Sequence, residues 1–344
     1  MRLYEITLLP CSALGTPLAG DTLFGQFCWQ AAYDPGLLPG GLEANLTRYP
    51  EAPFAVFSSA WPRFTQNGRV TYAVKRPDLP LDRLAPPPAG SRSQRLLHRK
   101  EVKKKSWLLV AEDLRLDPSR LADDLTLSEL LLAQAPPVIK RLCRRAGAQQ
   151  PLIPWEQPHN TINRQTLTTG KELFAPYTQE AHFYFPETEL ALFVLLDEAA
   201  TDLDRVCRGL TRIGQTGFGK DASIGLGRFK LTGHRELPLP QVPGADALFT
   251  LAPCVPPPHS FSEAFFTPLV RFGKHGDRLA TSKNPFKAPV VMAAPGAVFM
   301  PAEPQALTRP YFGRAVTGVS LVQPQAVVQG YAPVLPFPLE VHHA

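Results

Sequence analysis

The sequence is poor in side chains arranged to bind metals or form disulfides. Its five cysteines are an odd number scattered along 344 residues without a C-x-x-C pair, and its eight histidines show no H-x-x-x-H spacing. This pattern predicts reduced thiols, no metal site and no cofactor. No apolar run approaches the ~20 residues that cross a bilayer, and the N-terminus lacks a signal-peptide pattern. We therefore expect a cytoplasmic protein with no membrane partner.

Proline is the residue in excess, with 38 copies, and it limits uninterrupted helices and central strands. Hydrophobic residues make up 44% of the chain, which is enough for two or three domains with a large core. The 36 Lys and Arg residues exceed the 30 Asp and Glu residues, for a net charge of +6. A charge this mild does not by itself indicate a nucleic-acid partner, so the distribution of the cations matters more.

Strand and helix patterns occur in both halves of the chain. The patterns predict strands at 2–9, 107–110, 183–185, 191–196 and 228–232, and helices at 21–33, 126–134 and 201–213. Asp21 is the expected N-cap of the first helix. Strand–helix–strand units in each half predict an α+β fold of two ferredoxin-like domains, which are RRM-like βαββαβ units. We place one at 1–150 with a basic insert at about 75–110, and the other at 151–344 with a glycine-rich loop at 214–228.

The glycine-rich loop contains a near match to a nucleotide-binding P-loop. Asp221 follows its G-K pair where a P-loop requires Ser or Thr as a magnesium ligand, and two further glycines downstream disfavour the helix that a P-loop needs. The pattern therefore argues against an ATPase. The glycines can instead bring backbone N–H groups close to phosphates, with Lys220 and Arg228 adding positive charge. The alternative is a turn that only closes a strand–helix–strand unit.

Two further segments are candidates for contacts with nucleic acid. His159-Asn160 and Asn163-Arg164 offer side chains for base edges or phosphates. A nuclease would need an acid or a second cation beside the histidine, and a polar turn is the other interpretation. The run 92–105 holds seven Lys or Arg residues against one Glu, so it is either a finger along a nucleic-acid backbone or a solvated charge cluster.

Three segments, taken in order, resemble one family. They are G-T-P-L-A-G-D-T-L-F-G at 15–25, H-N-x-x-N-R at 159–164, and G-F-G-K-D-A-S-x-G-x-G-R-F at 217–229. With them the chain is similar to the fourth subunit of the Csm complex of type III-A CRISPR systems, a RAMP-superfamily protein of the group that caps the 5′ end of the guide RNA. The similarity runs from the first strand to about residue 340, and G-Y-A-P at 330–333 resembles the ending of the family.

The resemblance implies a non-catalytic RNA-binding subunit in antiviral defence, not an enzyme. It implies that the chain holds the 5′ repeat-derived tag of the CRISPR RNA (crRNA), with target RNA nearby. It implies two protein partners, the large polymerase-like subunit and the first backbone RAMP subunit of the filament. It also implies a thumb-like hairpin, for which the insert is our candidate. The candidate RNA-binding residues are Gly15, Thr16, Asp21, Lys75, Arg76, Lys103, Lys104, Lys105, His159, Asn160, Asn163, Arg164, Gly217, Phe218, Gly219, Lys220, Asp221, Ser223, Gly225, Gly227 and Arg228.

Two alternatives remain open. RAMP endoribonucleases that process precursor crRNA share the fold, but they resemble one another in a histidine near the first helix, whereas the first histidine here is His98. The corresponding subunit of the type III-B complex would differ in its partners and not in its physics.

Overall fold

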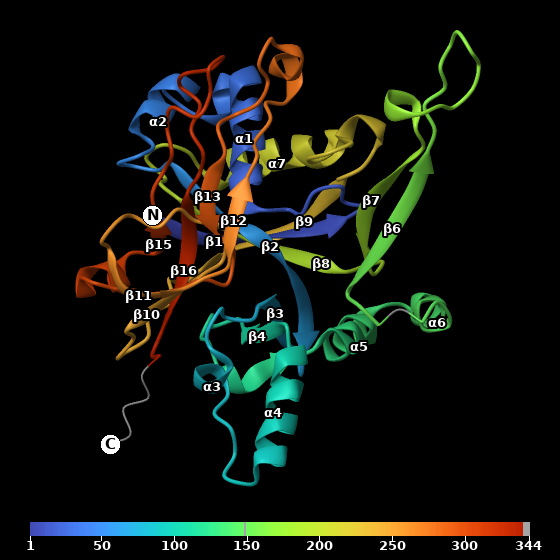
Figure 1. The fold of residues 1–344 in the computed structure, drawn as a ribbon. Helices are drawn as coiled ribbons and strands as arrows, with labels where there is room; N and C mark the ends of the chain where they lie inside the picture. The colour runs from blue at the N-terminus through green and yellow to red at the C-terminus, as the bar shows by residue number, and fades with distance from the viewer. Residues whose placement is uncertain (148, 340–344) are drawn as a thin grey trace.

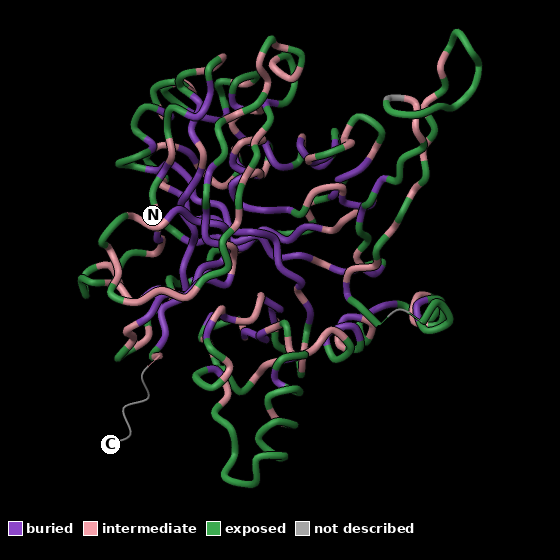
Figure 2. The backbone as a smooth tube through the Cα atoms, viewed as in Figure 1, coloured by how far each residue is buried: buried purple, intermediate pink, exposed green. Residues whose placement is uncertain are grey.

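The computed structural model describes residues 1–147 and 149–339 (Figure 1). At its centre lies a seven-stranded sheet with the order β5-β4-β3-β2-β8-β1-β9. The strands are β1 (Arg2–Pro10), β2 (Ala55–Gln66), β3 (Arg69–Lys75), β4 (Trp107–Ala111), β5 (Leu121–Ala122), β8 (Glu189–Leu196) and β9 (Phe229–Leu237). Figure 2 shows the buried residues concentrated at the centre of the molecule, around this sheet.

The two strand–helix–strand units are interleaved in this one sheet. β1 lies between β8 and β9 and is antiparallel to both, with Ile6 opposite Leu192 and His234. β2 is antiparallel to β8, so β1 and β2 run parallel, joined through α1 (Gly20–Tyr33). β8 and β9 are joined in the same way through α7 (Leu203–Thr216). This is a split βαβ arrangement. Its single sheet contains strands from both sides of residue 150, namely β1 to β5 before it and β8 and β9 after it.

α1 and α7 contact each other on one face of the sheet. Their stripes of buried residues meet the strands there, and Phe27 of α1 packs on Phe57 of β2 with ring centroids 5.7 Å apart. The helices approach closely because Gly209 of α7 carries no side chain: a Cβ there would lie 2.7 Å from the Phe27 ring. α1 begins at Gly20 with Ala19 as its N-cap, so the expected capping role of Asp21 is wrong.

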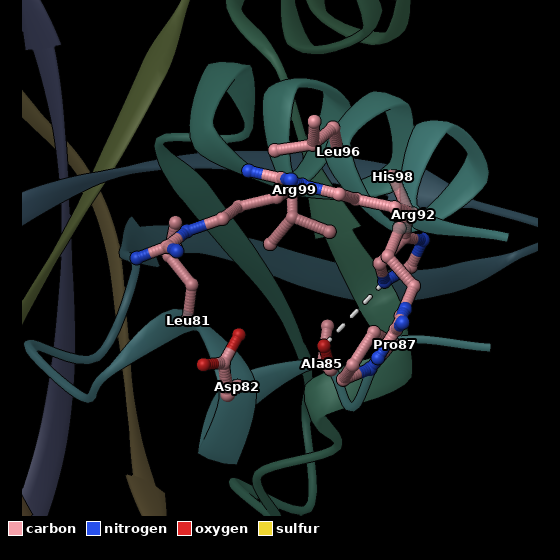
Figure 3. Close-up of a pocket in the computed structure, with 10 residues that line it drawn as sticks. Leu81, Asp82, Ala85, Pro87, Arg92, Leu96, His98 and Arg99 are labelled. Atoms are coloured by element: carbon pink, nitrogen blue, oxygen red, sulfur yellow. Dashed lines mark hydrogen bonds between the residues drawn. The ribbon is translucent and has the colours of Figure 1, made fainter. Parts of the chain in front are cut away.

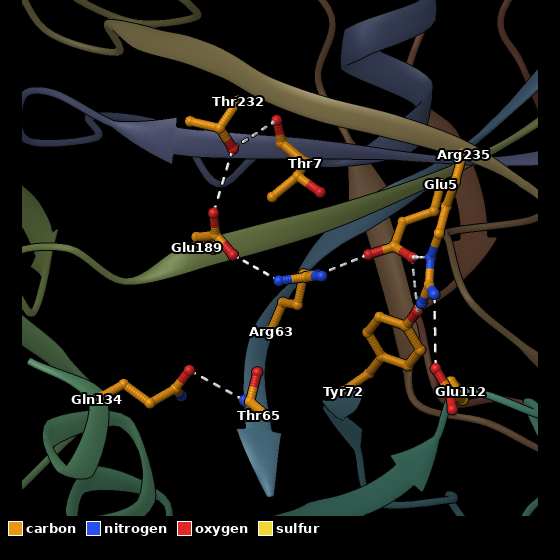
Figure 4. A network of polar contacts seen from close by, with 10 residues as sticks. All are labelled: Glu5, Thr7, Arg63, Thr65, Tyr72, Glu112, Gln134, Glu189, Thr232 and Arg235. Atoms are coloured by element: carbon orange, nitrogen blue, oxygen red, sulfur yellow. Dashed lines mark hydrogen bonds and ion pairs between the residues drawn. The ribbon is translucent and has the colours of Figure 1, made fainter. Parts of the chain in front are cut away.

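The other face of the sheet holds a network of charged side chains (Figure 4). Phe57 lies opposite Val194, which lies opposite Tyr4, so these three share the helix-covered face and the next residue, Glu5, points the other way. The Glu5 side chain is 1% exposed, and its carboxylate accepts hydrogen bonds from Arg63 (2.8 Å), Arg235 (2.6 Å) and the Tyr72 hydroxyl (2.7 Å). The network fixes β1, β2, β3 and β9 together, because each bond crosses strands.

The chain between β3 and β4 is helical and contains no thumb-like hairpin. It forms α3 (Leu81–Leu84) and α4 (Arg92–Lys104), which we call the α3–α4 arm. α4 begins at a capping box in which Ser91 Oγ accepts the Gln94 N–H and Gln94 Oε1 accepts the Ser91 N–H. The expected hairpin at about 75–110 is therefore wrong. The remaining helices of the first 147 residues are η1 (Pro35–Leu37), α2 (Leu42–Arg48), η2 (Pro118–Arg120), α5 (Asp124–Gln134) and α6 (Pro137–Arg145).

A long β-hairpin projects from the end of the molecule that lies opposite the α3–α4 arm (Figure 1). It consists of β6 (Leu152–His159) and β7 (Tyr177–Tyr184), which pair along their full length from Leu152 opposite Tyr184 to His159 opposite Tyr177. Its tip, residues 160–176, contains η3 (Glu172–Phe174) and is largely exposed (Figure 2). Pro154 and Pro158 fit this hairpin because β6 is an edge strand.

The C-terminal part builds a second sheet against β2. Trp61 Nε1–H donates to Leu251 O (3.1 Å), and the Gln329 side chain bonds both the N–H and the C=O of Phe57. Residues 217–339 contain three 3-10 turns and no α-helix, so the second ferredoxin-like domain is not confirmed. The elements are η4 (Ala222–Ile224), β10 (Ala247–Thr250), β11 (Phe261–Phe265), β12 (Pro268–Arg271), η5 (Asp277–Thr281), β13 (Val290–Ala293), β14 (Val298–Pro301), η6 (Pro304–Thr308), β15 (Tyr311–Gly313) and β16 (Tyr331–Phe337). Within the described residues, no helix combines the length and the apolar character needed to cross a bilayer.

Candidate nucleic-acid interface

The glycine-rich loop joins the end of α7 to β9, and backbone hydrogen bonds hold its two ends in place. Gly217 ends α7 with φ at +105°, and its N–H donates to Ile213 O (2.8 Å). The Phe218 side chain is fully buried, and its N–H donates to Gly227 O (3.0 Å). Phe218 therefore anchors the loop in the core, and its ring does not face a ligand in this conformation.

The segment after β1 packs directly on this loop. Thr16 Oγ1 accepts the Lys220 N–H (2.9 Å), and Ser12 Oγ accepts the Arg228 N–H (2.8 Å). A Cβ on Gly15 would lie 2.9 Å from Lys220 O, so the two backbones meet where glycine stands. The first and third sequence motifs thus form one continuous surface.

The base of the β6–β7 hairpin touches the same loop. Leu14 and His182 exchange both backbone hydrogen bonds (2.8 and 3.0 Å), and the Gln179 side-chain amide donates to the Asp221 carboxylate. The middle motif continues outward from there. The His159 ring stacks on Tyr177 (centroids 5.3 Å apart), while Asn160 and Arg164 are exposed.

The hairpin tip is organised as a polar turn. Asn163 Oδ1 accepts the Gln165 N–H (2.9 Å), and the backbone of Asn163 bonds that of Thr168 and Leu167. This matches the turn interpretation for Asn163. The hairpin connects the middle motif to the glycine loop at its base and carries Arg164 away from it at its tip.

Three glycines of the loop are required by close contacts inside the protein. A Cβ on Gly217 would lie 2.5 Å from Leu226 O, on Gly219 2.6 Å from Thr16 Cβ, and on Gly227 2.1 Å from Phe218 O. Gly225 is different. Its φ is +98°, and a Cβ there would meet nothing within 4 Å. The space beside Gly225 is therefore open to a ligand.

Most backbone N–H groups of the loop are already bonded within the protein. Ile224 and Leu226 donate to Asp221 O, Gly225 to Ala222 O, and Gly227 to Ala13 O. Within this fully described segment, the N–H groups of residues 219 and 221–223 have no protein acceptor. Gly219 and Asp221 both have positive φ (+75° and +63°), a backbone shape that turns successive N–H groups to one side. The N–H groups open to a phosphate, which we call the cradle, therefore lie at residues 219 and 221–223, within the wider segment 217–227 of the loop.

Cations flank this cradle. Lys220 is 58% exposed in its side chain, with Nζ 3.8 Å from the Asp221 carboxylate, and the Arg228 side chain is exposed. Ser223 is exposed beside them. Asp221 is the one unfavourable charge for a phosphate here, and the Gln179 amide and Lys220 ammonium partly offset it.

The remaining predicted residues lie elsewhere and have structural partners. Asp21 accepts two hydrogen bonds from Arg271 (2.6 and 3.0 Å); burial raises the pKa of Asp21, and the guanidinium opposes this. Lys75 pairs with Asp78 (3.0 Å). Arg76 donates to the carbonyls of Val102 (3.1 Å) and Lys105 (2.9 Å), which cap the end of α4. These contacts hold Asp21 and Arg76 in the fold.

Lys103, Lys104 and Lys105 stand at the C-terminal end of α4, away from the glycine loop (Figure 1). Lys103 and Lys104 are exposed and Lys105 is half-buried. Cations at this position favour the helix through its dipole, so the structure accounts for them without RNA. The structure does not bring them together with the three motifs.

Two residues of this surface were missed by the sequence reasoning. Ser12 and Gln179 hold the loop through the Arg228 N–H and the Asp221 carboxylate. Ser12 stands just before the first motif, so its position was a usable signal. No sequence signal indicated Gln179, because its contact with Asp221 depends on how β7 folds back onto the loop.

The loop geometry differs from that of a nucleotide-binding P-loop. The chain after Lys220 enters a single 3-10 turn and then β9, whereas a P-loop opens a long helix. His159 Nε2 is buried without a hydrogen-bond partner among the described residues. In the described part of the chain no three His, Cys, Asp or Glu side chains gather as a metal site.

Fold and surface together define a mixed helix-and-sheet protein whose glycine loop, first-motif segment and hairpin base form one site.

No family model matches the sequence, and no curated protein matches it. A chain of the Csm3-Csm4 subcomplex of the type III-A CRISPR-Cas interference complex is 13% identical with a TM-score of 0.55, covering 98% of this chain and 99% of that one. Chains of Csm1-Csm4 cassettes crystallised with pppApA and with cA4 are 15% and 14% identical, with TM-scores of 0.51 and 0.52 and full coverage of both chains. Csm4 is the component that these complexes share. The chain has a Csm4-like fold.

Proposed function

We propose that this chain is a non-catalytic, crRNA-binding subunit of a type III CRISPR effector complex, of the Csm4 family. In this proposal the glycine loop holds the 5′ repeat-derived tag, with target RNA nearby in the assembled complex. One observation carries the proposal: two of the three motifs that resemble the family form one surface at the loop, and the hairpin bearing the third is attached to it. The protein would act in the cytoplasm, where crRNA is assembled into effectors.

The proposal extends to partners. The similar structures are complexes in which Csm4 is bound to Csm1 or to Csm3. We infer that the chain docks a large polymerase-like subunit and the first backbone RAMP subunit. We further infer that the split βαβ unit is a ferredoxin-like RAMP domain, with residues 67–188 inserted between its second and third strands. The β6–β7 hairpin then takes the thumb-like role first assigned to the insert.

The loop is tested by placing a side chain in the open space beside Gly225. Asn adopts positive φ more readily than most residues with a side chain, so Gly225→Asn should cost less stability than a β-branched residue while its amide fills the space that RNA would enter. We expect a loss of tag-RNA affinity of about tenfold or more, in fluorescence anisotropy at one fixed salt concentration. Lys220→Ala should lose less, about two- to threefold, because it removes one solvated counterion-release contribution. Gly225→Val serves as a second, β-branched variant.

A thermal melt of each variant separates binding from folding. Native-like melting with lost affinity in Gly225→Asn supports the cradle. If the loop is only a turn, Gly225→Asn and Lys220→Ala will both bind like the parent protein, and Gly225→Val will lose affinity only in proportion to unfolding. Normal affinity in all three variants would move the binding surface away from the loop.

A further inference from the structure

The α3–α4 arm forms an open cavity that none of the three motifs explains. It has a volume of about 370 Å³ and lies between α3 and the face of α4 turned toward it (Figure 3). α3 is fixed in place because Arg83 pairs with Glu263 of β11 (2.9 Å) and lies over the Phe265 ring. The arm and the glycine loop lie in separate parts of the molecule (Figure 1).

Three arginines line one side of the cavity. Arg92, Arg95 and Arg99 follow one another at the three- and four-residue spacing that places them on one face of α4. All three are exposed, and no ion pair joins any of them to another described residue. Three unpaired guanidinium groups in a row repel one another, so an anion between them is favoured.

The other walls are apolar, with one carboxylate. Leu81, Ala85 and Pro87 come from α3 and the chain after it, and Leu96 comes from α4 with 52% of its surface exposed. Asp82 of α3 points toward α4 across the cavity (Figure 3). His98 Nε2 lies 3.4 Å from Ala85 O and ties the two walls together.

This combination fits one ligand chemistry better than others. An inorganic anion would use the arginines but leave the apolar wall uncovered. A fatty acid would cover the wall but offer no donor to Asp82. A nucleotide meets all three features, because its phosphate suits the arginines, its base covers the apolar wall or stacks on a guanidinium plane, and its amino or hydroxyl groups can donate to the carboxylate. The cavity volume lies within the range of small-molecule sites.

We propose that the cavity of the α3–α4 arm is a second RNA-binding site, which holds one nucleotide of a single-stranded segment. It goes beyond the proposed function, because it does not involve the glycine loop or the 5′ tag residues. The strand enters with its phosphates on the row of arginines, and one base turns onto the wall formed by α3.

Neighbouring residues of α4 provide a matched test. Arg99 lines the cavity, whereas Lys100 is exposed and lies outside the lining, so Arg99→Gln and Lys100→Gln remove the same charge one residue apart. Using the full chain and a labelled single-stranded RNA of about twelve nucleotides, we expect anisotropy to show at least about a fivefold loss for Arg99→Gln and under about twofold for Lys100→Gln. Arg95→Gln should behave like Arg99→Gln. The parent protein should bind an abasic strand more weakly than the intact strand, because base stacking adds affinity beyond the phosphate contacts.

Competition and mapping identify the ligand. A 4-thiouridine RNA should crosslink to the peptide 81–102, and AMP should compete only at concentrations at least about a hundredfold above the strand, since a strand has several phosphate contacts. AMP competing as well as the strand would assign the cavity to a free nucleotide and overturn the RNA-site proposal. Equal losses in Arg99→Gln and Lys100→Gln would reduce the arm to diffuse charge and overturn it too. Displacement of the RNA by an acidic peptide at equal concentration would favour a protein partner instead. Gly225→Asn in the same assay separates the two sites, because it should leave the Arg99-dependent loss unchanged.

Discussion

The pair of Asp21 and Arg271 joins α1 to β12 across 250 residues of sequence. Asp21 is 3% exposed and Arg271 is 27% exposed in their side chains. Removing the carboxylate leaves a largely buried guanidinium without its partner, which costs more than a surface ion pair does. We expect Asp21→Ala to lower the free energy of unfolding by about 2 to 3 kcal/mol in urea titrations. Glu43→Ala, at an exposed position, is the control, and equal effects of the two would contradict a structural role for Asp21.

His275 supplies a pH dependence. It is 5% exposed, and its Nε2 lies 2.7 Å from Ser320 Oγ. Burial, with the nearby Lys287 ammonium, lowers the pKa of His275 below its ordinary value of 6.5. The folded protein therefore resists a proton that the unfolded chain accepts, so stability present above pH 6.5 is lost as the pH falls from there toward the lowered pKa.

The measurement is the melting temperature as a function of pH, in the parent protein and in His275→Gln. Between pH 7.5 and about 5.5, the parent should lose more of its melting temperature than the variant, which lacks the buried imidazole at position 275. Parallel curves over this range would show that His275 does not contribute.

At the scale of elements, the sequence patterns predicted α1, α5 and α7 within a few residues of their observed ends. α4 was not predicted as a helix, because its exposed, cationic surface shows little apolar periodicity; its capping box, Ser91 with Gln94, was the available signal. The β6–β7 hairpin was not predicted because its prolines argue against central strands. Both strands of a projecting hairpin are edge strands, and prolines are tolerated in edge strands.

The residues of the candidate site, like the helices and strands, could be predicted only in part from the sequence. The glycine-rich loop was found from its glycine spacing, since close backbone contact leaves a composition signal, whereas Gly15 and Thr16 were named only through the family resemblance. Phe218 was expected at the RNA and lies in the core instead, because an aromatic residue between two glycines reads equally well as a stacking group or an anchor. Nothing in the sequence distinguishes Gly225, the open position, from Gly227, the crowded one.

At the scale of the whole molecule, local patterns do not determine which strands pair. Both strand–helix–strand units were visible, but two separate sheets and one interleaved sheet have the same local sequence signals. The buried Glu5 network favours the interleaved sheet, because it joins β1 and β2 to β9 through Arg63 and Arg235. Such a charge in a strand core needs partners, and those partners lie up to 230 residues away.

We propose that the entire chain does not turn over RNA or ATP, because the histidines of the two segments singled out in the sequence, His98 and His159, are held by the fold. The His159 ring stacks on Tyr177, and His98 faces the Ala85 carbonyl, so neither is paired with an acid that would set it up as a proton-transfer group. The purified chain, with divalent cations added, should leave repeat RNA intact on denaturing gels and release no phosphate from ATP. A trace of cleavage that is equal in the parent, His98→Ala and His159→Ala proteins would come from a contaminant. Cleavage that survives repurification and is lost in either variant would instead establish a RAMP endoribonuclease, and the role of the glycine loop would become substrate positioning.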